Sequence, residues 1–390
     1  MLRKYKYIAV LLLALITSGI GPAHAQTEVN TTNNAVACPQ RKATVYAAFD
    51  AIAAQYSPDI VGMCVGAVGP NATYAATKCY GETVTGYGIT PTSHTLFAIG
   101  SITKTMTATL LALRVNQGSV QLDDRVDKYL SSAYHIPKIT LLQLGDMESG
   151  LQKNPPDPYQ DPSDETQLYT DLQACVGDST CWKGVNHYIY SNFGYAVLGN
   201  VLADHDGYSK WSLDNFSSVM EPLGMFDTKG PEDYVPRDFS LRRAYGHQRA
   251  SAGDPWTVVR TAEVSAVAPA GQLWSTPSDM LIWLRIAAGV LQRYTEVGAA
   301  LKMTMECRGP WGKNSTCSSV QDCGRCTGLA WTEDIDQCTG GIRISKSGAV
   351  PGFKAWIGFD KGTGRGVFVL LNSGAIKGDT IGEKLLDMIP

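Results

Sequence analysis

The stretch Phe97-Ala98-Ile99-Gly100-Ser101-Ile102-Thr103-Lys104 opens a long helix-like run that extends from Ser101 to Gln117. Ser101 and Lys104 are three residues apart, so on a helix they share a face and the hydroxyl can meet the amine. A serine becomes a nucleophile when a base takes its proton, and a partly desolvated lysine is such a base. Gly100 places Ser101 at the helix start, where unpaired backbone N–H groups are available for an oxyanion hole.

The same stretch also has a structural interpretation. Serine is a common N-cap, and a lysine one turn later is commonly solvated. On these residues alone the catalytic and the structural interpretations are balanced. The distinction therefore depends on what else the chain carries.

Composition describes an ordinary globular protein. The chain has 390 residues, of which 44% are hydrophobic and 18% charged, with 39 glycines and 19 prolines. This is enough for one large domain or two of moderate size. The formal net charge is −3 and no basic stripe is present, which argues against a nucleic-acid partner.

The N-terminus has the three parts of a secretory signal. Arg3, Lys4 and Lys6 form a charged region, Ile8 to Ile16 is a short apolar run, and Ala23-His24-Ala25 is an A-x-A cleavage site. We predict a signal peptide over 1–25 and a flexible leader over 26–37. The apolar run is too short to span a bilayer, and no later stretch qualifies. We expect no transmembrane segment in the mature chain and a periplasmic or secreted location; an uncleaved anchor is the alternative.

The cysteines fit an exported protein. All 10 lie after the signal, and an even number in an oxidising compartment predicts disulfides. Cys64 and Cys79 are placed to bridge neighbouring strands, and Cys175 and Cys181 to close a small loop. Five more cysteines crowd the segment 307–338, so one of them must pair outside it, and parity leaves Cys38 as its partner.

Metal chemistry has little support in the sequence. Cys323-Gly-Arg-Cys326 resembles half of a zinc site, but no second Cys-x-x-Cys and no His-x-x-x-His completes it. The six histidines form no His-Glu-x-x-His set. We predict no metal and no cofactor.

Hydrophobic periodicity places strands at both ends of the chain and helices between them. The predicted strands are 60–68, 72–80, 342–345, 353–359 and 367–372, and the predicted helices include 44–56, a helix from Thr276 to Leu291, and 382–389. From Gly118 to Ala262 short helical runs are broken by proline and glycine. We predict an α+β protein with a discontinuous sheet-and-helix domain, 38–117 and 263–390, and a mostly helical inserted domain, 118–262.

Two further motifs decide between the interpretations of Ser101. Tyr190-Ser191-Asn192 precedes a helical segment, and Lys346-Ser347-Gly348 lies on a strand-like run. Together with Ser101-x-x-Lys104 they match, in order, the signature of serine β-lactamases and penicillin-binding proteins. The chain resembles the class C β-lactamase and D-alanyl-D-alanine peptidase family over about residues 40–385. The resemblance implies a β-lactamase/transpeptidase-like fold, with an antiparallel sheet flanked by helices.

The resemblance also assigns the catalytic roles. Ser101 is the nucleophile, and Lys104 and Tyr190 share the proton shuttle. A tyrosine is a usable base when nearby cations lower its pKa, and we expect Lys104 and Lys346 to do so. The structural alternatives are a packed aromatic for Tyr190, a helix cap for Asn192 and a solvated strand residue for Lys346.

The remaining implied roles concern substrate. Asn192 hydrogen-bonds the substrate amide, and Lys346 and Ser347 face the substrate carboxylate. Gly348 allows the substrate strand to approach the backbone closely. The oxyanion hole is formed by the backbone N–H groups of Ser101 and Ala349.

Two segments depart from the family pattern. Leu144-Gly145-Asp146-Met147-Glu148-Ser149-Gly150 stands where the family often has a His-Thr-Ser-Gly-like stretch, so we expect an unusual pocket wall carrying Met147 and Glu148, with Gln152 as a candidate substrate contact. The cysteine-rich segment 307–338 is expected to shape one rim of the cleft.

These features predict an exported serine hydrolase that forms an acyl-enzyme on Ser101 with β-lactams or D-alanyl-D-alanine peptides, as a β-lactamase or a D,D-carboxypeptidase/endopeptidase. The predicted partner is a small-molecule β-lactam or a peptidoglycan-derived peptide. An esterase of the same fold and a β-lactam sensor that is acylated but does not turn over are the alternatives. Esterase relatives often lose the lysine of the third motif, which this chain retains as Lys346.

Overall fold

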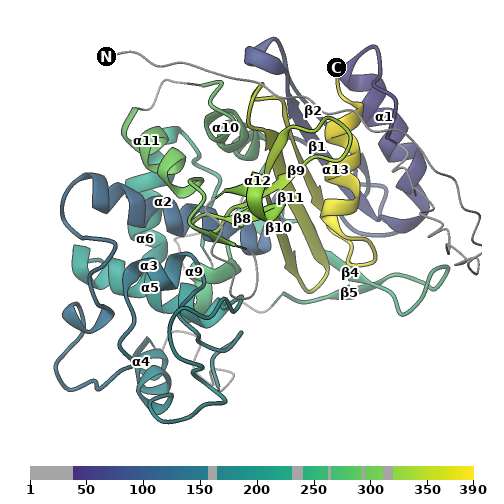
Figure 1. Ribbon diagram of the computed structural model, residues 1–390. Coiled ribbons are helices and arrows are strands. Elements are labelled where there is room, and N and C mark those ends of the chain that lie inside the picture. The colour runs from purple at the N-terminus through teal and green to yellow at the C-terminus, as the bar shows by residue number, and fades with distance from the viewer. Residues whose placement is uncertain (1–37, 157–164, 231–239, 262–264, 292–294, 311–318) are drawn as a thin grey trace, which may run out of the picture. The chain divides into compact units, whose positions relative to one another are not determined.

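The computed structural model describes residues 38–156, 165–230, 240–261, 265–291, 295–310 and 319–390 (Figure 1). These residues belong to one compact unit, Cys38–Pro390. The predicted signal peptide, the leader and Cys317 lie outside them. Within the described ranges, no helix combines the length and the apolar character needed to cross a bilayer.

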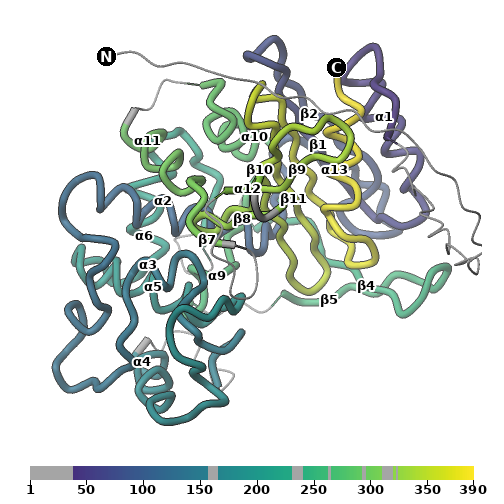
Figure 2. Tube along the Cα trace, viewed as in Figure 1, coloured from purple at the N-terminus to yellow at the C-terminus, as the bar shows by residue number. Residues whose placement is uncertain are grey.

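An eight-stranded antiparallel sheet organises the fold, with the strand order β2-β1-β12-β11-β10-β9-β8-β7. Its strands are β1 Gly62–Val68, β2 Ala75–Gly81, β7 Gly309–Pro310, β8 Arg325–Thr327, β9 Thr332–Ile335, β10 Ile342–Val350, β11 Phe353–Asp360 and β12 Gly366–Leu371. The pairing of β1 with β12 sets Val65 opposite Val369. Figure 2 shows β1, from the N-terminal part of the described chain, in the same sheet as the C-terminal strands, as the strands predicted near both ends of the sequence require.

Both faces of the sheet are covered by helices. Val367, Val369 and Leu371 of β12 belong to one apolar cluster, and Phe368 and Leu370 belong to another, because successive side chains of a strand point to opposite faces. The first cluster contains α1 Val45–Tyr56 and α13 Gly378–Met388, and the second contains α2 Thr103–Asn116 and α10 Pro277–Ala287 (Figure 1). β12 is therefore buried along its whole length.

Most of the remaining helices lie in the sequence between the Tyr190-Ser191-Asn192 motif and the Lys346-Ser347-Gly348 motif. The helices are α3 Leu141–Gly145, α4 Glu165–Ala174, α5 Asn192–Asp206, α6 Trp211–Asn215, α7 Glu221–Leu223, α9 Ala268–Gly271, α11 Thr295–Thr304 and α12 Val320–Cys323. Two small antiparallel pairs accompany them: β3 Phe97–Ala98 with β6 Trp274–Ser275, and β4 Gly246–Gln248 with β5 Thr257–Val259. The segment 118–262 thus contains a short sheet besides its helices. Its separation as a second domain stays a prediction.

The predicted starts of two helices are confirmed, and the predicted start of the closing helix is wrong. Thr44 caps α1 by accepting from the Ala47 N–H at 3.1 Å, and Thr276 caps α10 by accepting from the Asp279 N–H at 3.2 Å. The closing helix begins at Gly378, not at Gly382. A Cβ at Gly382 would lie 2.3 Å from the Trp356 ring, so this glycine permits close packing and does not mark a helix boundary.

Two disulfides join predicted pairs, and Cys38 pairs, as predicted, with one of the five clustered cysteines; the identity of that cysteine and the Cys307–Cys326 bond were not predicted. Cys64–Cys79 joins β1 to β2, Cys175–Cys181 closes a short loop, and Cys307–Cys326 lies within the cysteine-rich segment. Cys38–Cys338 links positions 300 residues apart. Because it closes so long a loop, this bond connects the start of the described chain to the region that follows β9.

Helix α2 is anchored at its C-terminal end by a buried ion-pair cluster. Arg114 contacts Asp206 at the end of α5, donates to Asp214 of α6 at 2.8 Å and donates to Ser218 at 2.7 Å. The Asp214 side chain is fully buried, and burial, reinforced by Asp206, raises the pKa of its carboxyl. Arg114 therefore compensates a carboxylate that the interior would otherwise disfavour.

We expect Arg114→Met to destabilise the protein by about 3 kcal/mol at pH 8, because it leaves a buried carboxylate uncompensated. The pKa of Asp214 is raised by folding, so its protonated form stabilises the native state as the pH falls. The loss at pH 5 should therefore be smaller. Urea unfolding at both pH values measures it, with Arg125→Met as the control, since the Arg125–Asp127 pair is exposed. Equal losses in the two variants, or a loss independent of pH, would contradict this role.

Candidate active site

Two glycines bring strand β10 against the turn that carries Ser101. Gly100 has φ +55°, and a Cβ at this position would lie 2.4 Å from the backbone nitrogen of Ala349. A Cβ at Gly348 would lie 2.0 Å from the carbonyl oxygen of Ile99. Larger residues would separate the third motif from the first. Gly348 therefore has a role inside the fold besides the predicted approach of a substrate strand.

Ser101 does not lie in the α-helix itself. It occupies a 3₁₀ turn, Gly100–Ile102, and α2 begins at Thr103. Its side chain is partly exposed, whereas Lys104 in the first turn of α2 is completely buried. The hydroxyl thus faces the cleft while its neighbouring amine is shielded from water.

The buried Lys104 amine has three polar neighbours. It lies 2.7 Å from Asn192 Oδ1 and 3.3 Å from Ser101 Oγ, and it contacts the carbonyl of Ala270. None of them is a carboxylate. Burial, and then the charges of Lys346 and Lys153, hold the pKa of Lys104 well below its usual range.

A neutral Lys104 amine matches these neighbours. In that form its two N–H bonds serve the Asn192 and Ala270 oxygens, and the remaining lone pair can accept the proton of the Ser101 hydroxyl, whose oxygen lies 3.3 Å away. The geometry is that of a nucleophile hydrogen-bonded to its base.

Tyr190 contacts the same hydroxyl from the other side. Its phenol donates to Ser101 Oγ at 2.6 Å. The Nζ atoms of Lys104 and Lys346 lie 4.9 and 5.2 Å from the centre of its ring. Burial raises the pKa of Tyr190, and its hydrogen bond with Ser101 offsets part of this increase. Our expectation that the two lysines lower this pKa is therefore wrong: desolvation of the phenol raises it, and both lysines are themselves buried.

Asn192 connects the second motif to the first. Ser191 caps α5 by accepting from the Gly194 N–H at 2.9 Å, which places Asn192 in the first turn of the helix. The Asn192 amide accepts from Lys104 and donates to Asn154 Oδ1 at 2.8 Å. Asn154 was not identified from the sequence, because an asparagine followed by two prolines is typical of an ordinary loop.

Lys346 presents a charge without a counter-ion. Its side chain is only 7% exposed, and no carboxylate of the described residues lies within ion-pair distance of its amine. Burial lowers the pKa of Lys346 to about 7. Ser347, the next residue on β10, is exposed, and by strand alternation its side chain points to the opposite face. Of the predicted carboxylate-binding pair, Lys346 thus lies on the Tyr190 side.

The edge of β10 is open beside Ser101. The pairing with β9 ends where Ser345 meets Thr332, so the residues after Ser345 have no strand on that side. Val350 and Phe353 flank the two-residue turn to β11, and alternation in the antiparallel ladder directs the Ala349 N–H away from β11. This N–H therefore points toward the open edge, adjacent to the Ser101 turn, as the predicted oxyanion hole requires.

A cleft of about 600 Å³ contains these groups. Its lining includes Ser101, Tyr190, Asn192, Lys346, Ser347, Gly348 and Ala349, together with Lys153, Asn154, Arg325, Thr332, Asp334, Ser345, Trp356, Asp379 and Glu383. Arg325, Thr332 and Asp334 come from β8 and β9, so the cysteine-rich segment does form one rim, as expected. The acidic residues of α13 were not identified, since their position beside the cleft depends on helix packing alone.

The expected pocket wall of Met147 and Glu148 does not line the cleft. Met147 is 1% exposed and belongs to the apolar core. Gln152 is held through its backbone, donating to the Cys181 carbonyl at 2.8 Å and accepting from Ser191 at 2.7 Å. Neighbouring Lys153 and Asn154 reach the cleft instead.

Comparison with known proteins agrees with this geometry. A family model described as Beta-lactamase matches residues 49–385. The chain is 26% identical over 279 residues to the D-alanyl-D-alanine-carboxypeptidase/endopeptidase AmpH of Escherichia coli K12, covering 65% of this chain and 67% of that protein. It is 27% identical over 214 residues to the teichoic acid D-alanine hydrolase of Staphylococcus aureus, covering 55% and 51% respectively.

The fold is also that of a solved relative. A class C beta-lactamase from Rhodobacter sphaeroides superimposes with a TM-score of 0.71 at 22% sequence identity, covering 88% of this chain and 97% of that one. This likeness confirms the predicted β-lactamase-like α+β fold. With the family model spanning all three motifs, the chain belongs to the beta-lactamase family and is a serine hydrolase.

Proposed function

We propose that this protein is an exported enzyme that forms an acyl-enzyme on Ser101 with D-alanyl-D-alanine peptides or with β-lactams. The observation that carries the proposal is the position of Ser101 Oγ, 3.3 Å from the Lys104 amine and 2.6 Å from the Tyr190 phenol, in a cleft that also holds the unpaired Lys346. These groups supply a nucleophile, a base, a proton donor and an anion site.

Acylation begins with transfer of the Ser101 proton to the neutral Lys104 amine. The oxygen attacks the substrate carbonyl, whose developing negative charge is stabilised by the N–H groups of Ser101 and Ala349. Tyr190, whose phenol remains protonated, donates to the departing nitrogen and is reprotonated from Lys104. With a peptide substrate, the amine product departs from the site. With a β-lactam, the ring opens and the amine remains covalently part of the acyl group.

Deacylation uses the same groups in reverse. A water molecule attacks the ester carbonyl, gives its proton to the Lys104–Tyr190 pair, and Ser101 leaves as the restored hydroxyl. The rate at which water reaches the ester distinguishes a β-lactamase from a penicillin-sensitive peptidase. Both outcomes use the arrangement described here.

Lys346 favours substrates that carry a carboxylate beside the reacting carbonyl. A buried ammonium without a counter-ion gains most from an anionic ligand, and both D-alanyl peptides and penicillins present one at this position. The D-alanyl substrate named for the Escherichia coli relative supports the peptide. The name of the Staphylococcus aureus relative, a teichoic acid D-alanine hydrolase, favours release of D-alanine from a polymer as the second candidate.

Export is supported by the signal-like residues 1–25 and by the disulfides, which persist in oxidising compartments. A periplasmic or secreted enzyme meets peptidoglycan-derived peptides directly. A sensor that is acylated once remains distinguishable by its lack of turnover.

Brief mixing of the mature protein with a penicillin should give a covalent adduct on Ser101, measured by intact-mass spectrometry. Ser101→Ala should give none, because it removes the nucleophilic oxygen. A transient adduct with accumulating hydrolysed drug indicates a β-lactamase, and a long-lived adduct indicates a peptidase or a sensor, which a D-Ala-D-Ala peptide separates. Labelling that persists in Ser101→Ala would refute the assignment.

Lys104→Met should slow acylation by about 10³-fold and Tyr190→Phe by about tenfold. Of these two groups, Lys104 has the lowered pKa that a general base needs, whereas the pKa of Tyr190 is raised. Stopped-flow acylation with a chromogenic β-lactam measures both rates, and thermal unfolding confirms that the variants are folded. A larger loss in Tyr190→Phe than in Lys104→Met would assign the base to the tyrosine.

The pH dependence should differ between substrates. The Lys346 amine must be protonated to bind a carboxylate, and its pKa in the free enzyme is about 7, so kcat/KM for anionic substrates should fall about tenfold per pH unit above pH 7. For a neutral ester, kcat/KM should not change above pH 7. Toward acid, activity on both should fall as Lys104 becomes protonated.

Lys346→Met should remove the alkaline decrease, together with most of the activity on anionic substrates, and spare the ester. Lys153→Met, which removes an exposed cation of the same cleft, is the matched control and should keep the alkaline decrease. An equal loss on both substrates in Lys346→Met would exclude a role in carboxylate binding.

A further inference from the structure

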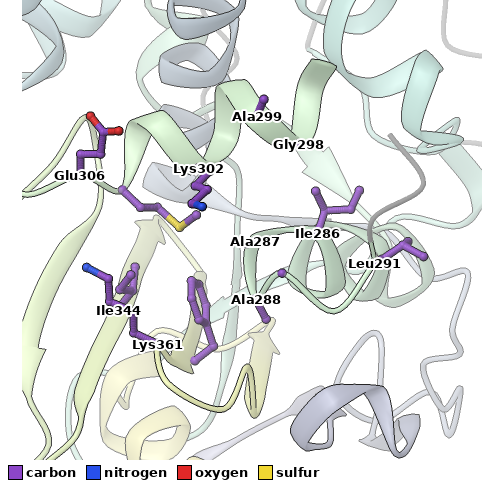
Figure 3. Close-up of a pocket in the computed structure, with 13 residues that line it drawn as sticks. Ile286, Ala287, Ala288, Leu291, Gly298, Ala299, Lys302, Glu306, Ile344 and Lys361 are labelled. Atoms are coloured by element: carbon purple, nitrogen blue, oxygen red, sulfur yellow. The ribbon is translucent and has the colours of Figure 1, made fainter. Parts of the chain in front are cut away.

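A second cavity, of about 670 Å³, lies away from Ser101 and shares no lining residue with the catalytic cleft. Figure 3 shows it between α11, the end of α10 and the strands of the sheet. Its lining consists of Ile286, Ala287, Ala288, Gly289 and Leu291, then Gly298, Ala299, Lys302, Met305 and Glu306, and finally Ile344, Phe359 and Lys361. The volume falls within the range of small-molecule sites.

The walls of this cavity are apolar. Ile286, Met305 and Phe359 are each less than 10% exposed. The space between them exists because the facing positions of the two helices carry glycine or alanine, such as Ala288 and Gly298. A ligand entering it would cover hydrocarbon surface that the fold leaves without a partner, which is favourable.

Three charged side chains lie around the cavity, and two of them are already paired. Lys361 contacts the buried Glu333 at 2.5 Å, and Glu306 contacts Arg308 at 3.1 Å. Lys302, in the last turn of α11, has no carboxylate of the described residues within ion-pair distance. In Figure 3 its side chain extends from α11 toward the strand residues on the other side of the cavity.

We propose that this cavity binds a small amphipathic monoanion, such as a medium-chain carboxylic acid. The hydrocarbon part lies against Ile286, Met305 and Phe359, and the carboxylate contacts the Lys302 ammonium. An anion is expected because, once Glu306 and Lys361 are paired, the charge that remains among the described lining residues is the positive charge of Lys302, beside an apolar space. The inference is independent of the activity proposed for Ser101.

Calorimetric titration of the mature protein with decanoate, kept below its micellar range, tests this site. We expect saturable binding of one decanoate per chain. Decyltrimethylammonium, with the same tail and the opposite charge, should bind about tenfold more weakly. Lys302→Gln should weaken decanoate binding about two- to fivefold, as for an exposed ion pair, and Lys302→Glu should reverse the preference between the two amphiphiles.

Ala288→Trp fills the cavity and should abolish binding of both probes, while hydrolytic activity and the thermal unfolding temperature show that the variant is folded. Lys138→Gln, an exposed lysine elsewhere, is the matched control and should bind as the wild type does. The proposal fails if decanoate does not bind at millimolar concentration, if the two head groups bind equally, or if Ala288→Trp and Lys302→Glu leave binding unchanged.

Discussion

The catalytic arrangement depends on one amine that is buried without a charged partner. Within the described residues, the hydrogen-bond partners of Lys104 are neutral oxygens, and the faces of Tyr190 and Tyr195 lie beside its amine. In such surroundings the neutral form of an amine is favoured, because desolvation penalises the ammonium. A carboxylate in place of Asn192 would hold the proton on the amine and remove the base. The fold therefore places this residue at the first turn of a helix that is buried along most of its length.

Burial of α2 in turn requires elements from the whole chain. Four threonines of the helix, Thr103, Thr105, Thr107 and Thr109, are completely buried, and their hydroxyls bond to carbonyls of the same helix, to Pro269 and to the Leu273 N–H. Polar side chains are tolerated there because each has a partner. Arg114 fixes the other end of the helix to α5 and α6. The burial of Lys104 and the ion pairs of Arg114 therefore depend on the same packing of α2 against its neighbours.

The two lysines of the cleft show how burial is used in two ways. Lys104 is enclosed, and desolvation lowers its pKa, which suits the base proposed for it. Lys346 lines the open cleft with a pKa of about 7, so in the proposed mechanism a bound carboxylate would raise that pKa and be held by the resulting charge. Tyr190 lies between them with a raised pKa, which keeps its proton available for the leaving group. The proton path follows from these three environments.

The order of the motifs, the family, the strands at both ends and two of the disulfides, Cys64–Cys79 and Cys175–Cys181, could be predicted from the sequence, because these depend on local periodicity and residue identity. The sequence also placed Ser101, Lys104, Tyr190, Asn192 and Lys346 as one set. Only the tertiary structure decided the direction of the pKa of Tyr190, the withdrawal of Met147 into the core and the presence of Asn154 and Asp379 in the cleft. Each of these depends on what other segments bury or leave open around a residue. Solvation of a side chain is a property of the packed molecule, and no local pattern of residues specifies it.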